Sequence, residues 1–530
     1  MKKTRFLLHI LILLLLIACS KSDNETAEVL PQVLPPTVIT LEATDITENS
    51  ATLGGNIPDD GGSAITERGV CWATTNSPTI KNNFSQIGTG KGSFTTLIKE
   101  LHEKTRFYVR AYATNEKGTM YGDEISFTTL EKPPLIYEGN VTLNSQEMVD
   151  EFAIHNYSEI TGDLTIAYDN NHPEWELIHN LAKLNSLTTI GGSLFIYGTA
   201  NLTSSEGLTN ISWIGGNIEI IGTNIPSITF LENIKEYNGS LTLRRLGSLQ
   251  SLAGLENCTK INGDLIIDYN PDLIEIDALT NITSVIGRVN IEYNPSLTNL
   301  NGLSSLKDVD RYLSIYKNDV LTDISGLHSL ETVRWMLSIE HCPLLTNING
   351  LDNLFQVQGI EINDNDALSN IDGLEHVLSV NGITESLAIT NNSSLIDISV
   401  LALNTEVIKS IQISRNDNLT DLSGLKNLKS IEQLAIEGNN SLTEITGLNN
   451  LQSVTQALSI SNNDNLISIS GFEAISSFEG RLTIWYNRKL SDLCGLTPIF
   501  KNGLQKDKYG VDGNAYNPSY QDFFDGKCNP

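Results

Sequence analysis

The side chains that usually carry catalysis are scattered through this 530-residue sequence. Its eight histidines show no His-x-x-x-His spacing, which a zinc site on a helix would use. The sequence also lacks a Gly-x-Ser-x-Gly nucleophile elbow and a phosphate-binding glycine loop. Carboxylates are abundant, so a glycosidase-type pair remains an open alternative. We expect no catalytic residues, no cofactor and no metal, and therefore no enzyme.

Three clusters of asparagine and aspartate could offer oxygen ligands to calcium. They lie at residues 363–366, 415–418 and 462–465. They lack the Gly-Gly-x-Gly-x-Asp repeat that calcium sites in β-rolls use. We interpret them as surface turns, with an occasional weakly bound ion as the alternative.

A second set of side chains suits non-covalent binding. Two outward columns of aromatic and basic residues follow a repeated apolar pair, and their members would lie about 4.8 Å apart on adjacent strands. Binding surfaces favour rigid aromatic side chains because these lose little entropy on binding. The alternative is a solvated sheet face on which tyrosine is simply a good strand residue. The candidate ligand-binding residues are Arg244, Arg245, Tyr269, Tyr293, Tyr316 and His341.

The apolar pair beneath these columns has the form apolar-x-apolar and occurs 14 times, mostly 23 or 24 residues apart. A fixed period of this size is typical of a solenoid. Strand spacing would turn both residues of each pair into the core. The pairs are Leu164/Ile166, Leu194/Ile196, Ile218/Ile220, Leu241/Leu243, Leu265/Ile267, Val289/Ile291, Leu313/Ile315, Leu337/Ile339, Ile360/Ile362, Leu387/Ile389, Ile411/Ile413, Leu434/Ile436, Leu458/Ile460 and Leu482/Ile484.

After each pair, apolar residues fall at every third position. This spacing suits a coil with short sides and tight corners better than a long strand or an α-helix. A glycine precedes the leucine at one corner, and we expect it to supply backbone freedom there. These glycines are Gly302, Gly326, Gly350, Gly373, Gly424, Gly447, Gly471 and Gly495.

An asparagine three residues after the pair is the second repeated feature. Stacked coils would place these amides above one another, where each can bond its neighbour and backbone groups that would otherwise be buried unpaired. Cys258 and Cys342 occupy inward positions too far apart to bond each other, so we expect buried free thiols there and at Cys71. The expected structural ladder consists of Asn270, Asn294, Asn318, Asn365, Asn392, Asn416, Asn439, Asn463 and Asn487.

The pattern L-x-I-x-x-N-x-x-L-x-x-I-x-G-L-x-x-L-x-x-I resembles the receptor L domain. That domain is the leucine-rich-repeat-like, right-handed β-helix of insulin- and EGF-type receptor ectodomains. The resemblance covers about residues 137–528 and implies an all-β solenoid of about 14 coils. The array is longer than one receptor L domain usually is, so the resemblance does not imply a ligand geometry.

The charge of the chain argues against nucleic-acid binding. It has 34 basic and 63 acidic residues, a formal net charge of −29. The mean field therefore repels phosphate, and no run of lysine and arginine reverses it locally.

The N-terminus indicates export. Basic residues precede an apolar run at residues 6–17 that is too short to span a membrane. The four residues ending at Cys19 (Leu-Ile-Ala-Cys) resemble a bacterial lipobox. This implies a signal peptide at residues 1–18, lipidation of Cys19 and an outer-membrane anchor; an ordinary signal peptide is the alternative. The acidic start of the tether at residues 19–36 resembles the tag that sends lipoproteins to the cell surface in Bacteroidetes-type bacteria.

Residues 37–131 alternate short β-rich runs with turn sequences, which predicts a β-sandwich. The stretch at residues 101–118 resembles the closing half of a fibronectin type III domain. It departs from that family at Glu103, where proline is usual, and at Phe107, where the corner tyrosine usually lies. No Arg-Gly-Asp sequence is present, so we expect a spacer, with ligand binding as the alternative.

Caps are expected at both ends of the solenoid, residues 137–493, because its core would otherwise be open. A capping box that begins near Ser145 predicts a helix over about residues 144–156. The apolar pairs stop after Cys494, so residues 494–530 are expected to form the second cap. Cys494 and Cys528 bracket this cap and are disulfide candidates in an exported protein.

These features predict a surface-anchored lipoprotein that recognises a glycan or a protein on the cell exterior through the sheet face of the solenoid. A structural surface-coat component without a single specific ligand is the alternative, and a carbohydrate-active enzyme is the third. Two carboxylates facing each other across a cleft, roughly 5–10 Å apart, would indicate the enzyme. A preformed, aromatic-lined surface would indicate the binder.

Overall fold

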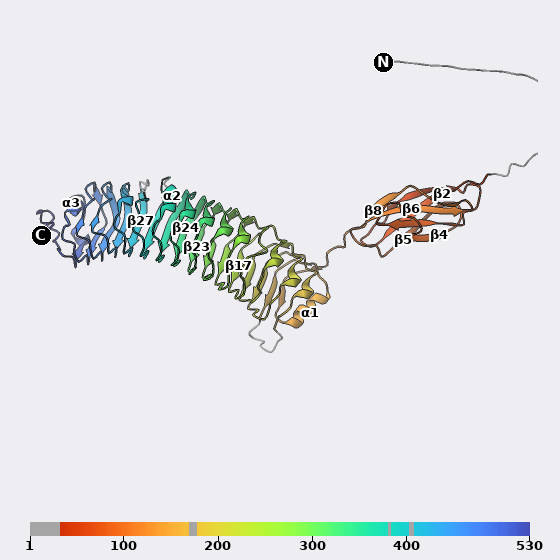
Figure 1. Ribbon diagram of the computed structural model, residues 1–530, viewed down its shortest axis with the longest axis horizontal. Coiled ribbons are helices and arrows are strands. Elements are labelled where there is room, and N and C mark those ends of the chain that lie inside the picture. Colours follow the sequence, from red (N-terminus) through yellow and green to blue (C-terminus); the bar gives the residue numbers. More distant parts are fainter. Residues whose placement is uncertain (1–31, 169–176, 380–382, 402–406) are drawn as a thin grey trace, which may run out of the picture. The chain divides into compact units, whose positions relative to one another are not determined.

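The structure is a computed structural model that describes residues 32–168, 177–379, 383–401 and 407–530. The chain divides into two compact units, Met1–Pro133 and Pro134–Pro530. Each unit has a hydrophobic core of its own, and the two cores share no residue. Figure 1 labels their elements along the chain.

The first unit consists of two antiparallel sheets that enclose a small core. One sheet has the order β1-β2-β5, and the other has the order β4-β3-β6-β7 with β8 paired to β6. Val109, for example, is fully buried, whereas Tyr108 and Arg110 on either side of it are partly exposed, as expected for a strand with one face on a core. The strands are β1 (Thr37–Thr44), β2 (Ala51–Asp59), β3 (Glu67–Ala73), β4 (Asn83–Gly88), β5 (Gly92–Ile98), β6 (Arg106–Asn115), β7 (Gly118–Tyr121) and β8 (Ile125–Thr128).

The second unit is a stack of coils whose strands form one long parallel sheet. All 14 apolar pairs lie on strands of this sheet, and β10 and β34 extend it at its two ends. This continuous parallel sheet makes the unit a leucine-rich-repeat-like β-solenoid. In order, the sheet contains β10 (Val141–Leu143), β12 (Leu164–Ala167), β14 (Leu194–Tyr197), β16 (Ile218–Ile221), β17 (Leu241–Arg244), β18 (Lys260–Ile261), β19 (Leu265–Asp268), β20 (Ser284–Val285), β21 (Val289–Glu292), β22 (Asp308–Val309), β23 (Tyr312–Tyr316), β24 (Thr332–Glu340), β25 (Gln356–Asn363), β26 (Ile383–Thr390), β27 (Val407–Ser414), β28 (Ser430–Glu437), β30 (Ser453–Ser461), β32 (Ser477–Phe478), β33 (Arg481–Trp485) and β34 (Tyr509–Asp512).

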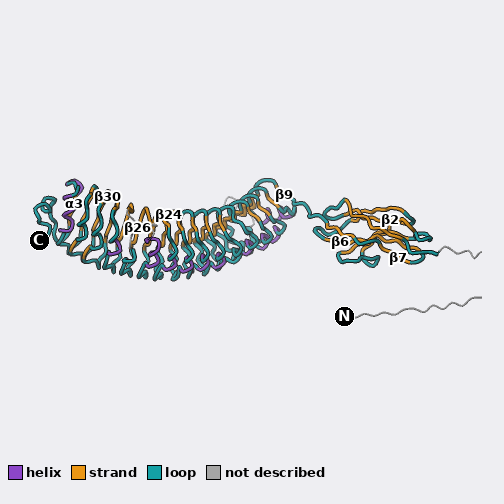
Figure 2. The backbone as a smooth tube through the Cα atoms, turned by 90° about the horizontal axis from the view of Figure 1, so that it is seen from above, coloured by secondary structure: helices purple, strands orange, loops and turns teal. Residues whose placement is uncertain are grey.

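Most coils have the strand on one side and a single 3-10 turn on another (Figure 2). Equivalent apolar residues lie in register from coil to coil, for example Ile267, Ile291 and Ile315, and all three are fully buried. Two smaller parallel sheets add β9 (Ile136–Tyr137), β11 (Glu159–Ile160), β13 (Thr189–Ile190) and β15 (Trp213–Ile214), and β29 (Glu444–Ile445) with β31 (Ser468–Ile469). The 3-10 turns are η1 (Ala182–Leu184), η2 (Glu206–Leu208), η3 (Thr229–Leu231), η4 (Asp277–Leu279), η5 (Asn301–Leu303), η6 (Ser325–Leu327), η7 (Asn349–Leu351), η8 (Asp372–Leu374), η9 (Ser423–Leu425), η10 (Cys494–Leu496) and η11 (Lys506–Lys508).

The repeated glycine has a different role from the one expected. Only Gly447 and Gly471 of the set have positive φ. Gly302 lies inside η5, where an added Cβ would come within 1.8 Å of the Ile276 carbonyl oxygen of the preceding coil. The same contact, at 2.0 Å, limits Gly326 against Leu300. The glycine is therefore required for close approach between coils in most of the stack, rather than for backbone freedom.

The N-terminal end of the stack is covered by α1 (Gln146–Ile154). The Ser145 side chain accepts a hydrogen bond from the Met148 backbone N–H at this helix's N-terminus. Val149 is fully buried, and Phe152 packs partly buried against the same core. A second short helix, α2 (Glu375–Ser379), directly follows η8.

The C-terminal end contains one more coil than predicted. Strand β34 pairs in register with β33, and Tyr509 and Val511 take the positions of the apolar pair. Three residues later, Asn514 accepts a hydrogen bond from the Asn487 backbone N–H at 3.0 Å and so continues the ladder. The prediction that the repeat stops after Cys494 was therefore wrong. A tyrosine in place of leucine or isoleucine concealed the last pair.

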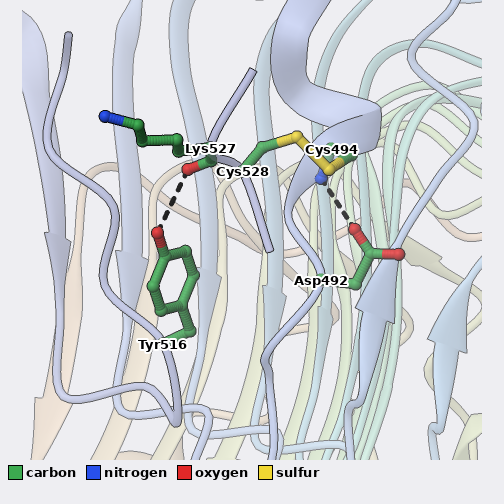
Figure 3. The surroundings of a disulfide bond; sticks show 5 residues. All are labelled: Asp492, Cys494, Tyr516, Lys527 and Cys528. Atoms are coloured by element: carbon green, nitrogen blue, oxygen red, sulfur yellow. Dashed lines mark hydrogen bonds between the residues drawn. A yellow bond between two sulfur atoms is a disulfide. The ribbon is translucent and has the colours of Figure 1, made fainter. Parts of the chain in front are cut away.

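Segments before and after β34 cover the core at this end. Helix α3 (Thr497–Lys501) follows η10, and Phe500 stacks on Phe523 with ring centroids 3.8 Å apart. A disulfide joins Cys494 to Cys528, with a Cα–Cα distance of 4.8 Å (Figure 3). Nearby, the Tyr516 hydroxyl donates a hydrogen bond to the Lys527 carbonyl at 3.2 Å. Among the described residues, no helix has the length and apolar character needed to cross a membrane.

Candidate binding groove

A sharp turn follows each central strand of the solenoid and places three successive residues in different directions. In the coil of β21, the strand ends at Glu292, and Tyr293 then adopts a left-handed conformation with φ 54°. Asn294 points inward and is fully buried, whereas Pro295 returns to the surface. Stacking this turn along the solenoid creates a groove with two walls and a floor of asparagines.

The floor is fixed by the asparagine ladder. The Asn294 Nδ2 donates to the Ile267 carbonyl at 2.9 Å, and its Oδ1 accepts from the Asn270 backbone N–H at 3.2 Å. The Asn294 backbone N–H in turn donates to the Asn318 Oδ1 at 3.1 Å. Every asparagine of the predicted ladder is fully buried. At Cys342 the thiol replaces the amide, and the Cys342 backbone N–H still donates to the Asn365 Oδ1 at 3.0 Å.

Four of the six candidate residues do not lie on the flat sheet face, where the sequence predicted them. Arg245, Tyr269, Tyr293 and His341 each come one residue after the strand ends, and each has φ between 54° and 58°. The strand period therefore does not extend to them, and they project along one wall of the groove. The difference arises because a left-handed residue breaks the alternation of strand side chains.

These four residues line a hollow of about 720 Å³ on the surface of the solenoid. It spans six successive coils and is open to solvent along its length. Its lining consists of Arg245, Tyr269, Pro271, Tyr293, Pro295, Lys317, Asp319, His341, Pro343, Asp364 and Asp366.

The tyrosine side chains of the aromatic wall pack against each other. The Tyr269 and Tyr293 rings stack with centroids 4.2 Å apart and an interplanar angle of 10°. A hydrogen bond with Tyr293, together with burial, raises the pKa of Tyr269. Tyr269 nevertheless remains 40% exposed, so its ring is available for contact.

Two cations bracket this pair of rings. The Arg245 guanidinium lies 5.5 Å from the Tyr269 ring centroid, and the Lys317 ammonium lies 5.4 Å from that of Tyr293. Both distances fall within the range of cation–π attraction. The wall is thus an ordered column of a guanidinium, two rings and an ammonium.

Tyr316 and Arg244 support the groove without lining it. Tyr316 is the last residue of β23, and its ring contacts those of Tyr293 and His341 at centroid distances of 5.2 and 5.0 Å. Arg244 binds the buried Asp268 carboxylate through Nε at 2.8 Å and an Nη nitrogen at 2.7 Å. This bidentate pair engages Nε and one Nη nitrogen and gives Arg244 a positioning role, while its direct contact with a ligand stays a prediction. Because Asp268 immediately precedes Tyr269, the pair holds the strand end beside the ring.

Acidic residues lie toward the other end of the hollow. His341 Nε2 is 3.7 Å from the Asp364 Oδ2, and Asp319 and Asp366 lie on the opposite wall. The His341 Nδ1 atom is buried and has no hydrogen-bond partner among the described residues. The hollow therefore changes from aromatic and cationic at Arg245 to carboxylate-rich at Asp366.

Sequence reasoning missed the second wall. Pro271, Pro295 and Pro343 recur two residues after the aromatic column, on the far side of the buried asparagine. Their repeated offset was visible in the sequence, and so was Lys317 in the same column as the tyrosines. The turn that brings them opposite the tyrosines was not visible.

None of the predicted cysteine sites lines the groove. Cys19 lies outside the described residues. Burial raises the pKa of both the Cys258 and the Cys342 thiol to about 12, and that of Cys71 to about 11. All three are free and buried, so they pack as apolar side chains. Within the described ranges, no group of three or more histidine, cysteine or acidic side chains could hold a metal ion.

Neither a known protein family nor a curated protein matches this chain. Several solved structures align with parts of it. A leucine-rich repeat protein from Eubacterium ventriosum is 10% identical, and the alignment covers 77% of this chain and 94% of that one, with a TM-score of 0.16. The sensor domain of the anti-sigma factor RsgI4 from Pseudobacteroides cellulosolvens is 16% identical over 19% of this chain and 100% of that one, with a TM-score of 0.16. Domains from titin are 24% identical over 18% of this chain and 32% of that one, with a TM-score of 0.14. These scores carry no argument about function, so the groove is interpreted from its own residues.

Proposed function

We propose that this protein is a surface-anchored binding protein whose solenoid holds a glycan or protein ligand in the groove between Arg245 and Asp366. Binding is non-covalent, and the tyrosine wall makes the principal contacts. This proposal moves the site from the sheet face to the turn beside it.

One observation carries the proposal: large side chains occupy turn positions that favour glycine or asparagine. Other coils place Gly198, Gly222 or Gly438 at the same left-handed position. Five consecutive coils instead place Arg245, Tyr269, Tyr293, Lys317 and His341 there. A left-handed conformation costs a residue with a Cβ about 1–2 kcal/mol.

Five unfavourable backbone conformations in consecutive coils reduce stability. We infer that the side chains at these positions have a function that offsets this cost. The stacking of Tyr269 on Tyr293 and the flanking cations offset part of the conformational cost. Strained positions of this kind cluster at ligand-binding sites, where they preorganise the contact surface. A fixed aromatic wall opposite a row of prolines meets that description.

The remaining parts of the chain fit the same proposal. Lipidation at Cys19 would anchor the protein in the outer membrane, and residues 19–36 would tether it on the cell exterior. The two-sheet unit would be a fibronectin type III-like spacer, and the solenoid a right-handed, receptor L domain-like β-helix. No one of these features determines the ligand.

The test uses the soluble unit of residues 134–530, whose core lies entirely within residues 141–528. An array of glycans and extracellular-matrix proteins is probed with this unit and with a Tyr269→Asn/Tyr293→Asn variant. Tyr312→Asn is the matched control, because Tyr312 is an exposed tyrosine at the start of β23 outside the groove. We expect selective binding that the control keeps and the double variant loses.

Two results would overturn the proposal. Binding that the double variant retains would place the site elsewhere on the solenoid. A folded unit that binds nothing on the array would favour the surface-coat alternative.

A further inference from the structure

A second hollow continues the groove beyond Asp366. It has a volume of about 630 Å³, and Asp366 lines both hollows. Its walls come from the same two turn positions, now carried by the coils that follow. The lining consists of Asp366, Asn391, Ser393, Arg415, Asp417, Gly438, Asn440, Asn462, Asp464, Tyr486, Arg488 and Gly513.

The two hollows differ in chemistry. The first presents tyrosine and proline, whereas the second presents mainly amides, hydroxyls and carboxylates. Along one wall of the second hollow, the Asn440 Nδ2 donates to the Asp417 Oδ1 at 2.8 Å, and its Oδ1 accepts from the Asp464 backbone N–H at 3.3 Å. The Arg488 Nε lies 3.5 Å from the Asp464 Oδ1. A continuous line of donors and acceptors therefore follows the solenoid axis.

We propose that the two hollows form a single groove that binds an uncharged, unbranched polysaccharide lying parallel to the solenoid axis. This inference rests on the proposed function and specifies its ligand. At about 4.8 Å per coil, the groove from Arg245 to Gly513 is roughly 50 Å long. Only an extended polymer could occupy this length.

The charges of the groove favour an uncharged ligand. Basic residues occur on both walls of the groove, Arg245, Lys317 and Arg415 on one and Arg488 on the other, and aspartates also line both walls. A polyanion or polycation would therefore meet like charges in several coils. The net charge of −29 adds a long-range repulsion against polyanions.

The hydrogen-bonding groups favour sugar hydroxyls over a peptide backbone. An extended peptide is usually bound by an unpaired strand edge, and the central strands here are paired on both sides by neighbouring coils. The groove floor offers no backbone partner either, because the asparagine ladder already bonds those groups. The side-chain amides of Asn391 and Asn462 line the second hollow and can both donate and accept, as a sugar hydroxyl does. The aromatic hollow would pack on the apolar faces of sugar rings at one end of the chain.

The experiment measures affinity against chain length. The probes are unbranched, uncharged gluco-, manno- and xylo-oligosaccharides from disaccharide to dodecasaccharide, with polygalacturonate and polyproline for comparison. The protein is the unit of residues 134–530, its Arg415→Gly/Asn462→Gly variant and the control Lys426→Ala. Glycine suits the left-handed turn at Arg415 and Asn462, so this variant removes side chains without straining the fold. Lys426 is exposed, carries the same charge as Arg415 and lies outside the groove.

We expect one uncharged series to bind about tenfold or more tightly at its longest member than at its shortest. The Arg415→Gly/Asn462→Gly variant should lose this gain and still bind the short members, whereas Lys426→Ala should behave as the parent protein. Affinity that stops rising at three or four sugars would overturn the inference. So would preferred binding of polygalacturonate or polyproline, or of a matrix protein on the array, although the proposed function would then stand. Failure of every ligand would remove the proposed function itself.

Discussion

Tyr269 and Tyr293 stack with ring centroids 4.2 Å apart, although each projects from a turn residue with φ above 50°. Local backbone preference and side-chain packing therefore oppose each other at these two positions. The turn would be easier to form with glycine or asparagine, as in other coils of the same solenoid. Tyrosine rings occupy both positions despite this backbone preference. We assign them a binding role for that reason.

The first prediction separates stability from binding at the groove. Tyr293→Asn removes the ring but places a residue that tolerates the left-handed conformation at the turn. We expect the free energy of unfolding to change by less than about 1 kcal/mol, because lost stacking and relieved backbone strain offset each other. Affinity for the ligand found on the array should fall about ten- to hundredfold. Urea denaturation and titration of that ligand measure the two effects. A variant that unfolds easily and binds normally would show that Tyr293 is structural.

The second prediction concerns the ladder under the groove. Asn318→Ala removes the acceptor of the Asn294 backbone N–H and the donor to the Ile291 carbonyl. The Asn294 N–H would be left buried without a partner and the Ile291 carbonyl would lose its bond from the amide, so we expect a loss of about 1–3 kcal/mol in the free energy of unfolding. Hydrogen exchange should rise first in the coils on either side. The control is Asn281→Ala, an exposed asparagine whose side chain makes a single bond, to the Glu256 carbonyl. Equal losses in the two variants would contradict the structural role of the ladder.

The repetitive part of this fold could be predicted because each coil meets the same physical demand. An apolar pair must enter the core, and a buried turn must satisfy its own backbone groups, so leucine, isoleucine and asparagine recur at fixed offsets. The last coil escaped notice because Tyr509 replaces the usual aliphatic residue. Strand β4 carries a weak signal of its own, because the sequence Asn-Phe-Ser-Gln-Ile-Gly has few of the residues that favour strands.

The site could be predicted only in part. The sequence indicated Tyr269, Tyr293 and His341 as outward residues, since the period of the repeat requires it. It could not indicate the direction in which they project, because that depends on a change of φ sign after the strand. Pro271 and Pro295 were overlooked for the same reason: a left-handed residue turns the chain and brings them opposite the rings.

The third prediction uses a pair of glutamates on the sheet beside the groove. Burial and the neighbouring Glu340 raise the pKa of Glu361 above its usual value, so the folded state binds this proton more tightly than the unfolded state does. The stabilising effect is complete below the usual pKa and is lost as the pH rises through the raised value. Glu361→Gln should therefore be more stable than the parent protein at neutral pH, and the difference should disappear in more acidic solution. Glu340→Gln, which removes the like charge, should flatten the same pH profile. Urea denaturation at a series of pH values measures both, and parallel profiles for parent and variants would refute the assignment.

The fourth prediction tests why glycine recurs in the 3-10 turns. At Gly302, a Cβ would lie 1.8 Å from the Ile276 carbonyl oxygen and 2.5 Å from its carbon, and neither backbone atom can move without displacing the preceding coil. Gly302→Ala should therefore cost about 1–3 kcal/mol, even though alanine is the better residue in a helical turn. Gly247→Ala is the matched control, because the Cβ there would meet only the flexible Asn224 side chain, at 3.3 Å. Gly302 does not have positive φ, so alanine would fit its backbone conformation if conformational freedom were the only requirement. In that case, Gly302→Ala and Gly247→Ala would be tolerated equally well. A large loss at Gly302 and a small one at Gly247, both measured by urea denaturation, would instead show that the spacing between coils limits which residue can occupy this turn.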